Sequence, residues 1–444
     1  MGILGAMATA ISGLRVQSYA LENISGNIAN SQTTGFKRVD TAFVDLVPDL
    51  PKGQERSGSV GAFSRLTNTT PGDLQPTGIP TNMAISGEGY FIVADPTGGG
   101  DLFTRRGDFA PDKDGYLVNG AGYRLKGVSI DPVTGKASGT NEVLQLATKP
   151  IPANRTSAIT YQANLPNKPL TEAAKAKGTS ATTADRLLPA ASTPTTTTPV
   201  VEDATFLDHS LEGGKVTVYD ALGTPVTMEL RWGKVEDVST GSDRWALMYC
   251  TKTTAPKEWR LASDSIAFDA SGQMTAATMS TLPITISNLT IDGTAIGNVD
   301  INFGNSALTQ RYDESGLVTP DLVTQDGYSS GTLTAVSVDS DGTISGSYSN
   351  GRIVPIAKVP IAQFNADGAL RRLDGGVYQQ TLESGDPILS NEGATIVGGN
   401  VEGSNTDIAD EFSKIIVTQQ AYSANTRVVT TSQQMLADVL NMLR

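Results

Sequence analysis

Two segments of the chain have the 4-3 spacing of apolar positions that is typical of amphipathic helices, and they lie at its two ends. We call these positions the predicted seam. In the N-terminal segment they are Leu4, Met7, Ile11, Leu14, Ser18, Leu21, Ser25 and Ile28. In the C-terminal segment they are Phe412, Ile415, Gln419, Tyr422, Thr426, Val429, Gln433, Leu436, Leu440 and Leu443. This a/d pattern predicts two long terminal helices, the first about 25 residues and on the order of 37 Å long.

The sequence between these ends has the alternation of short β-strands. In GTLTAVSVDSDGTISGSYS, Leu333, Ala335, Ser337 and Asp339 fall on one face and Thr334, Val336 and Val338 on the other, with a turn at Asp339–Gly342. The 46 Gly and 22 Pro residues favour many strands joined by tight turns. A length of 444 residues suggests two to four domains.

Both terminal segments are nearly free of charge. Between residues 2 and 35 only Arg15 and Glu22 are charged, and between residues 412 and 443 only Lys414, Arg427 and Asp438. A solvated coiled coil carries Glu and Lys beside its seam, so these uncharged surfaces favour burial against neighbours. The simpler interpretation is a two-helix hairpin within the chain. The alternative pairs the two ends within a subunit and buries their outer faces against other copies.

On the second interpretation, the helices are expected to be frayed in the monomer and ordered in an assembly, because most helix stability comes from tertiary packing. The polar seam positions can be tolerated irregularities, or they can fix register and partner choice at some cost in stability. Because few charges are present to do that work, we favour the second role.

The start and end of the helices have recognisable signals. Before the C-terminal helix, Ser404, Asn405 or Thr406 is expected to cap, and Asp407, Asp410 and Glu411 suit the positive helix end. After the N-terminal helix, ANSQTTGFK supplies Asn30 and a glycine that is free to turn. We interpret this stretch as a joint, formed by Ala29, Asn30, Thr33, Gly35, Phe36 and Lys37.

Composition excludes several kinds of chemistry. A net charge of −13 argues against a phosphate-binding surface. With Cys250 as the only cysteine and His209 as the only histidine, neither an intramolecular disulfide nor a Cys/His zinc site can form. A catalytic triad would have to use His209, for which we find no nucleophile. We therefore expect no enzyme, no catalytic residue, no cofactor and no metal.

Two small motifs admit more than one interpretation. The stretches DKDG (Asp112–Gly115) and DSDG (Asp339–Gly342) begin like calcium loops but lack the later ligands, so we expect hairpin turns. The pairs Arg105–Arg106 and Arg371–Arg372 each stand beside an aspartate. They can form local ion pairs or contacts between subunits.

Several stretches resemble one protein family. ANSQTTGFKR is similar to a motif shared by axial proteins of the bacterial flagellum, the rod and hook family, and residues 402–444 resemble that family's closing helix. Residues 77–93 and 102–127 resemble the opening of its first β domain, and residues 215–232 its outer β domain. Residues 325–387 look like the returning half of the first domain in hook proteins specifically.

The resemblance implies a mainly β fold with an α-helical terminal coiled coil, and nested discontinuous β domains inserted between the helices. The implied divisions are 1–30 with 406–444 as the coiled-coil core, 31–70 with 388–405 as a joint and linker region, 71–155 with 322–387 as an inner β domain, and 156–321 as an outer β domain. Residues 171–204, rich in Thr and Pro, are expected to form an exposed loop or linker.

The resemblance also implies a function. It is that of a structural subunit of the flagellar hook, assembling with itself into a flexible curved tube that couples motor rotation to the filament. Implied partners are rod and hook–filament junction proteins, the hook cap and the export apparatus, with no nucleic acid and no membrane insertion. Type III export to the extracellular hook and basal body fits the absence of a cleavable signal peptide. The alternatives are a distal rod subunit or an extracellular adhesive or carbohydrate-binding β protein.

Overall fold

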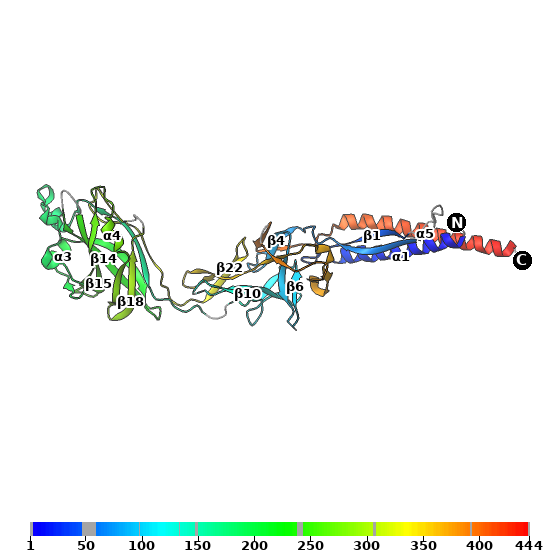
Figure 1. Cartoon of the computed structure of the whole chain (residues 1–444), viewed down its shortest axis with the longest axis horizontal. Helices are drawn as coiled ribbons and strands as arrows, with labels where there is room; N and C mark the ends of the chain where they lie inside the picture. The colour runs from blue at the N-terminus through cyan, green and yellow to red at the C-terminus, as the bar shows by residue number, and fades with distance from the viewer. Residues whose placement is uncertain are drawn as a thin grey trace. The chain divides into compact units, whose positions relative to one another are not determined.

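The structure is a computed structural model that describes residues 3–46, 59–96, 98–132, 134–146, 150–237, 243–304, 308–390 and 393–442. The chain divides into two compact units (Figure 1). The first unit comprises Met1–Lys149 and Leu333–Arg444, and the second comprises Pro150–Thr332. The second unit is therefore inserted into the first, which is built from both ends of the chain.

The N-terminal and C-terminal segments of the chain, both in the first unit, form two long helices, as the sequence predicts. Helix α1 spans Ile3–Ala29 and helix α5 spans Ile408–Met442, and they lie side by side in Figure 1. Gly13 lies against Asn425 and Asn27 against Glu411, so the two helices are antiparallel and keep one register over this length. With 35 residues, α5 is about 52 Å long. The predicted fold class, mainly β with terminal helices packed together, is confirmed.

A β-hairpin follows the first helix. Strands β1 (Val39–Leu46) and β2 (Ser59–Leu66) pair antiparallel along their whole length. The hairpin packs along α1, where the Asn23 amide donates to Thr41 Oγ1 at 2.9 Å and the Tyr19 hydroxyl lies 2.5 Å from Ser64 Oγ. The predicted joint region 31–70 thus contains regular strands. Its residues 47–58 lie outside the described part of the chain.

The β part of the first unit is one large sheet with two small ones. Its main path runs β21 (Leu333–Val338), β22 (Thr343–Tyr348), β23 (Ile353–Lys358), β9 (Arg124–Ile130), β5 (Tyr90–Ala94), β6 (Asp101–Thr104), β26 (Val377–Gln379) and β25 (Arg371–Arg372). Joined to it are β7 (Phe109–Pro111), β8 (Leu117–Asn119), β10 (Ala137–Val143), β24 (Ile361–Gln363) and β27 (Ile388–Leu389). Nearby, β3 (Leu74–Pro76) pairs with β29 (Asn400–Glu402), and β4 (Met83–Gly87) with β28 (Ala394–Gly398). Outgoing and returning segments of the chain therefore close one core.

The second unit contains two five-stranded sheets. One runs β17 (Ile284–Ile291), β18 (Thr294–Asn302), β11 (Ala158–Pro166) and β19 (Leu308–Arg311), with β20 (Thr319–Gln325) on β11. The other runs β12 (Val200–Val201), β16 (Glu258–Phe268), β15 (Asp243–Lys252), β14 (Pro225–Glu236) and β13 (Leu211–Tyr219). Their shared core buries Trp232, whose indole N–H donates to the Tyr161 hydroxyl at 3.0 Å. Short helices α3 (Ala204–Asp208) and α4 (Ala276–Ser280) complete this unit.

The Thr- and Pro-rich residues 171–204 form a surface segment of the second unit with short helices, closer to the expected exposed loop than to the expected linker. Helix α2 (Glu172–Lys177) is capped by the Thr171 hydroxyl, and the buried Leu188 packs in a core with Phe206 and Trp259. The segment's continuous exposed runs of three or more residues are 175–180, 182–184 and 195–198. Sparse apolar residues such as Leu188 are enough to hold the stretch on the unit's surface.

The DKDG and DSDG stretches form hairpin turns, as predicted. In each, the glycine N–H donates to the carbonyl of the first aspartate at 3.0 Å, for Gly115 to Asp112 and Gly342 to Asp339. Both glycines have a φ of +85°, which favours glycine. Val336 and Val338 turn toward the core of the first unit, in line with the expected alternation.

Candidate assembly interface

The face on which α1 and α5 meet is built from small and polar residues. Buried or half-buried positions of α5 along it are Glu411, Ile415, Thr418, Ala421, Asn425, Val429, Ser432 and Leu436. On α1 the buried positions are Ala10, Val16, Ala20, Ile24 and Asn27. A Cβ on Gly13 would stand 2.8 Å from Asn425 Nδ2, so glycine lets the two backbones approach.

The predicted seam coincides with this contact face only in part, at Ile415, Val429 and Leu436 of α5. In α1, Leu4, Ile11, Ser18 and Ser25 are exposed, and Met7, Leu14, Leu21 and Ile28 are half-buried. In α5, Phe412, Gln419, Tyr422, Thr426, Gln433 and Leu440 are exposed, while Ile415, Val429 and Leu436 are half-buried. Leu443 lies outside the described residues. Most of the seam therefore flanks the contact within the subunit, and its assembly role stays a prediction.

Helix α5 turns most of its large apolar side chains toward solvent. They are Phe412, Ile416, Val417, Tyr422, Val428, Met435, Val439, Leu440 and Met442. Val417 and Leu440 are 65% and 66% exposed, and Met442 is 86% exposed. Exposed large apolar side chains in this number mark an interaction site. They are spread around the helix, and among its large apolar residues only Ile415, Val429 and Leu436 are half-buried on the side of α1.

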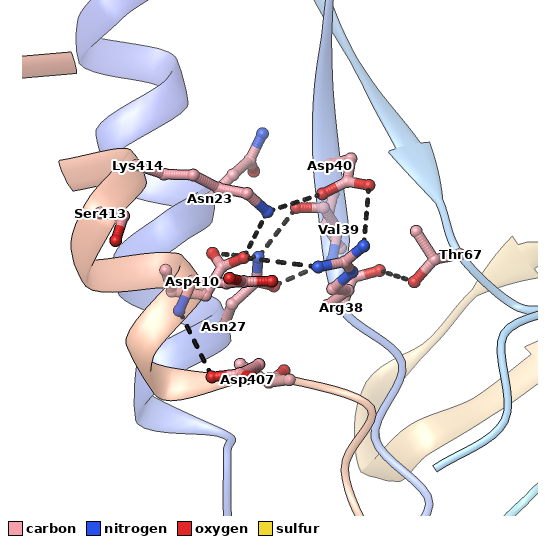
Figure 2. Close-up of polar contacts among 12 residues, drawn as sticks. Asn23, Asn27, Arg38, Val39, Asp40, Thr67, Asp407, Asp410, Ser413 and Lys414 are labelled. Carbon is pink, nitrogen blue, oxygen red and sulfur yellow. Dashed lines mark hydrogen bonds and ion pairs between the residues drawn. The ribbon is translucent and has the colours of Figure 1, made fainter. Parts of the chain in front are cut away.

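A buried polar cluster ties both helices to the hairpin (Figure 2). The Asn27 side chain accepts from Val39 N at 2.9 Å and donates to Val39 O and to Glu411 Oε2, each at 3.0 Å. The Glu411 carboxylate is fully buried and lies 2.6 Å from Lys414 Nζ. Lys414 also reaches Asp40 at 3.4 Å. Because these bonds join α1, β1 and α5 at one level, they fix the point where the helices enter the β part.

The cap of α5 differs from the expected one. Asp407 accepts from the backbone N–H groups of Ala409 and Asp410, at 2.8 and 3.3 Å (the Asp410 bond is drawn in Figure 2). The expected cap Asn405 instead accepts from Arg38 N at 2.7 Å and donates to the Thr67 carbonyl. The Asn405 side chain therefore holds the segment before α5 against the segments around Arg38 and Thr67, and Asp407 caps the helix.

A second buried cluster lies under the joint. Lys37 and Glu402 are both fully buried and pair at 2.5 Å, and Arg105 lies 3.4 Å from the other oxygen of the Glu402 carboxylate. Lys37 also donates to the Thr70 carbonyl at 2.7 Å. Burial lowers the pKa of Lys37, because the ammonium loses water, although Glu402 opposes that shift. The sequence predicted Lys37 as a joint residue but gave no indication of its partner 365 positions away.

The other joint residues lie around this cluster. Ala29 ends α1, and Asn30 donates to the Gly26 carbonyl while accepting from Thr33. Gly35 has a φ of +65° and donates to the Glu402 carbonyl at 2.7 Å. The Phe36 ring is buried beneath Arg372, whose guanidinium lies 4.6 Å from the ring centroid.

The paired arginines have separate roles. Arg106 forms a local ion pair with Asp108 at 2.7 Å. Arg105 is 3% exposed, so the expectation of a contact between subunits is wrong for this residue. Arg372 packs on the joint, and Arg371 is exposed.

The described residues contain no group of three or more His, Cys, Asp or Glu side chains that could hold a metal ion. Within the same residues, no helix is long and apolar enough to cross a bilayer. His209 Nδ1 contacts the Thr205 carbonyl at 2.9 Å at the end of α3. Cys250 is buried, and burial raises the pKa of its thiol to about 11.

Four families of known proteins match successive parts of the chain. Residues 7–37 match the family described as flagella basal body rod protein, and residues 84–164 match the flagellar hook protein FlgE/F/G D1 domain. Residues 187–328 match the flagellar basal body protein FlaE D2 domain. Residues 397–442 match the flagellar basal body rod FlgEFG protein C-terminal family. The matches follow the order helix, first β region, second β region, helix.

Individual proteins are similar over the full length. The flagellar hook protein FlgE of Brucella suis is 29% identical over 451 aligned residues, covering all of both chains. The flagellar hook protein FlgE of Escherichia coli is 27% identical and covers 98% of this chain and all of its own. A crystal structure of Helicobacter pylori flagellar hook protein FlgE2 aligns with a TM-score of 0.51 at 16% identity, covering 72% of this chain and 98% of that chain. The last similarity supports the fold.

Proposed function

The chain belongs to the rod and hook family of flagellar axial proteins and is a structural, non-enzymatic hook subunit, and from this premise we propose that α1 and α5 are the elements through which it polymerises. The family implies self-assembly into the hook and a location in the hook and basal body. Which surfaces carry that assembly in this chain is the subject of the proposal.

The observation that carries the proposal is the number of large apolar side chains that α5 leaves exposed in the subunit. Phe412, Val417 and Leu440 are among them. In an isolated subunit this arrangement leaves apolar area in water, at a cost of about 25 cal/mol per Å² relative to burial. Packing against other copies removes that cost. The helices are then expected to gain order on assembly, because tertiary packing supplies most helix stability.

We propose that the contacts between copies are heterologous, so that one surface of a subunit meets a different surface of its neighbour. Contacts of this kind that do not close into a ring generate a helical filament. We propose that the terminal helices form the inner layer of a tube and that the β units face outward. Bending of the tube would come from small displacements between β units, while the two buried polar clusters keep each helix pair attached to its own β part.

Several finer features also belong to this proposal. The tube is expected to be curved and flexible and to couple motor rotation to the filament. Its partners would be rod and hook–filament junction proteins, the hook cap and the export apparatus, with export by the flagellar type III route. A distal rod subunit would use similar terminal helices in a straight polymer. The full-length similarity to hook proteins favours the hook.

Substitution on the outer surface of α5 tests the proposal. Val417→Asp and Leu440→Asp place charge where the proposed contacts are dry, so polymer should fail to form in a sedimentation assay. Ser423→Asp adds the same charge at a position that is exposed and already polar, and it should weaken assembly less. Hydrogen exchange on the wild-type chain should show slower exchange in α1 and α5 after polymerisation.

Two outcomes would contradict the proposal. The first is polymerisation of Val417→Asp and Leu440→Asp at the wild-type concentration. The second is full protection of both helices in the dilute monomer, with no change on assembly. Electron microscopy of the polymer separates a curved hook from a straight rod.

A further inference from the structure

The outer stripe of α1 carries two of the few charges on the terminal helices. We use this name for Leu4, Ala8, Ile11, Arg15, Ser18, Glu22, Ser25 and Ala29, which recur at 4-3 spacing and are all exposed. The only charged members are Arg15 and Glu22. Neither side chain has an ion-pair or hydrogen-bond partner among the described residues. The hairpin and α5 pack on other sides of α1, so this stripe is uncovered in the subunit.

The outer stripe of α5 has the same construction. It consists of Val417, Gln420, Ala424, Arg427, Thr431, Met435 and Asp438, which follow one another at intervals of three or four residues and are all exposed. Arg427 and Asp438 are its only charges, and the side chain of neither has a partner in the described part of the chain. Each stripe thus presents one cation and one anion in an otherwise uncharged surface.

We propose that the outer stripe of α1 packs against the outer stripe of α5 of a second copy, in the register that pairs Arg15 with Asp438 and Glu22 with Arg427. This inference rests on the proposed function, since it names the contact through which copies assemble. Opposite charges that meet in a low-charge interface set register and partner choice more than they add affinity.

The order of the charges selects the direction of the pairing. In an antiparallel pair, the cation nearer the start of α1 meets the anion nearer the end of α5, and both ion pairs form together. The two charges are seven residues apart on α1 and eleven on α5, a difference of about 6 Å along the axis. When the two ion pairs share this difference equally, the residues of each pair are offset by about 3 Å along the axis. An arginine side chain spans that distance. A parallel pair can form only one of the two bonds, because the other charge then has no counterpart at its level.

The direction has a consequence for the assembly. Within a subunit α1 and α5 are already antiparallel. An antiparallel contact between α1 of one copy and α5 of another therefore requires both copies to point the same way. A polymer of such copies has one polarity, as a tube joining two different structures needs.

The proposed register also fixes how far neighbouring copies are displaced along the helix axis. In the subunit Arg15 lies level with residue 423 of α5, from the Gly13–Asn425 and Asn27–Glu411 contacts. In the proposed contact it lies level with about residue 436, so the second copy is displaced by about 20 Å along the helices. Ile11 then lies near the exposed Val439 and Met442 of that copy. A displaced contact does not close on itself, and it extends.

Charge reversal tests the pairing in the full chain. Arg15→Glu and Asp438→Arg should each raise the critical concentration for polymerisation about five- to tenfold, because each replaces an attraction by a repulsion. The double variant Arg15→Glu with Asp438→Arg should return it to within about twofold of wild type. Arg15→Lys keeps the charge and serves as the matched control. The difference between variants should shrink in high salt.

A cross-link measures the register independently. In a chain carrying Ser18→Cys and Thr431→Cys, the two cysteines lie about 3 Å out of step in the proposed contact, whereas within one subunit residue 18 is level with residue 420, about 16 Å along the axis from residue 431. Oxidation of the polymer should therefore produce a ladder of covalently linked copies, and the dilute monomer should produce none.

The outcomes separate this inference from the proposed function. If wild-type and reversed chains polymerise equally, or if the double variant is no better than either single one, the charge pairing is overturned while polymerisation stands. A polymer of the two-cysteine chain that gives no ladder overturns the register. A wild-type chain that forms no polymer under any condition overturns the proposed function itself.

Discussion

Removal of the Glu402 carboxylate should destabilise the first unit and leave the second unit unchanged. The carboxylate is fully buried, pairs with Lys37 at 2.5 Å and with Arg105 at 3.4 Å, and accepts from Gly72 N at 2.9 Å. Glu402→Ala leaves two buried cations without their counter-ion and one amide without an acceptor. Breaking a buried ion pair from one side costs about 3–5 kcal/mol.

The remaining contacts place the expected loss at the lower end of that range. Lys37 keeps its bond to the Thr70 carbonyl at 2.7 Å, and Arg105 keeps the Gly87 carbonyl at 2.8 Å. We therefore expect the free energy of unfolding of the first unit to fall by about 3 kcal/mol. That is a large share of the roughly 5–15 kcal/mol typical of a domain.

The positions of the tryptophans allow the two units to be measured separately. Trp232, Trp245 and Trp259 are the only tryptophans and all lie in the second unit, so their fluorescence in urea reports that unit. The rate of amide hydrogen exchange in β4 and β5 reports the stability of the first unit. Glu402→Ala should speed hydrogen exchange in β4 and β5 and leave the urea midpoint of the tryptophan fluorescence unchanged. Glu229→Ala, which removes the partner of two lysines in the second unit, is the mirror control and should do the reverse.

Two results would refute the reasoning. A loss below about 1 kcal/mol in Glu402→Ala would mean that the buried cations find water or other partners without cost. An equal change in the fluorescence midpoint would mean that the effect is not local to the first unit. Lys37→Met combined with Glu402→Ala should cost less than the two single changes added together, because the pair acts as one.

Three further predictions concern the joint, acid stability and the single thiol. Gly35→Ala should cost about 1–3 kcal/mol, seen as faster exchange at the joint, because the φ is +65° and the added Cβ would lie 2.7 Å from Arg106 N. Hydrogen bonds, first from the Ser315 hydroxyl, hold the pKa of Asp313 below its ordinary 3.8, so the stability it contributes is full above that value and is lost as the pH falls through the lower folded-state pKa. The tryptophan midpoint in urea should drop in that range, and Asp313→Asn should flatten the dependence. Cys250, whose burial raises its pKa to about 11, should react with a thiol reagent at about pH 8 only after unfolding.

Local features of the fold were predictable from sequence because their causes are local. The turns at Gly115 and Gly342 follow from an aspartate three residues before each glycine, which together fix the hydrogen bond of the turn. The existence of α1 and α5 follows from the 4-3 spacing maintained along both segments. The end of α1 near Asn30 and Gly35 follows from residue chemistry at the joint.

Features that depend on distant residues were not predictable in the same way. Asn405 was one of three residues expected to cap α5, and its side chain instead bonds Arg38 N and the Thr67 carbonyl. Arg105 was compatible with an exposed contact, but Glu402, 297 residues away, draws it inside. In residues 171–204 the low apolar content suggested a linker or an exposed loop, and a few buried residues, among them Ala174 and Leu188, are enough to anchor the stretch.

The orientation of the terminal helices shows why a seam read from spacing alone is ambiguous. A 4-3 pattern of apolar residues recurs on neighbouring stripes of one helix, so spacing predicts that a helix packs but not which stripe meets which partner. In this chain Gly13 lets α5 approach α1 closely and the bond between Asn27 and Glu411 fixes their register, and neither feature belongs to the 4-3 pattern of apolar residues. The apolar stripes left over are then the ones available to other copies. Assembly is therefore expected to depend more on Val417 or Leu440 than on the buried Thr418 and Ser432, which hold the subunit's own helix pair.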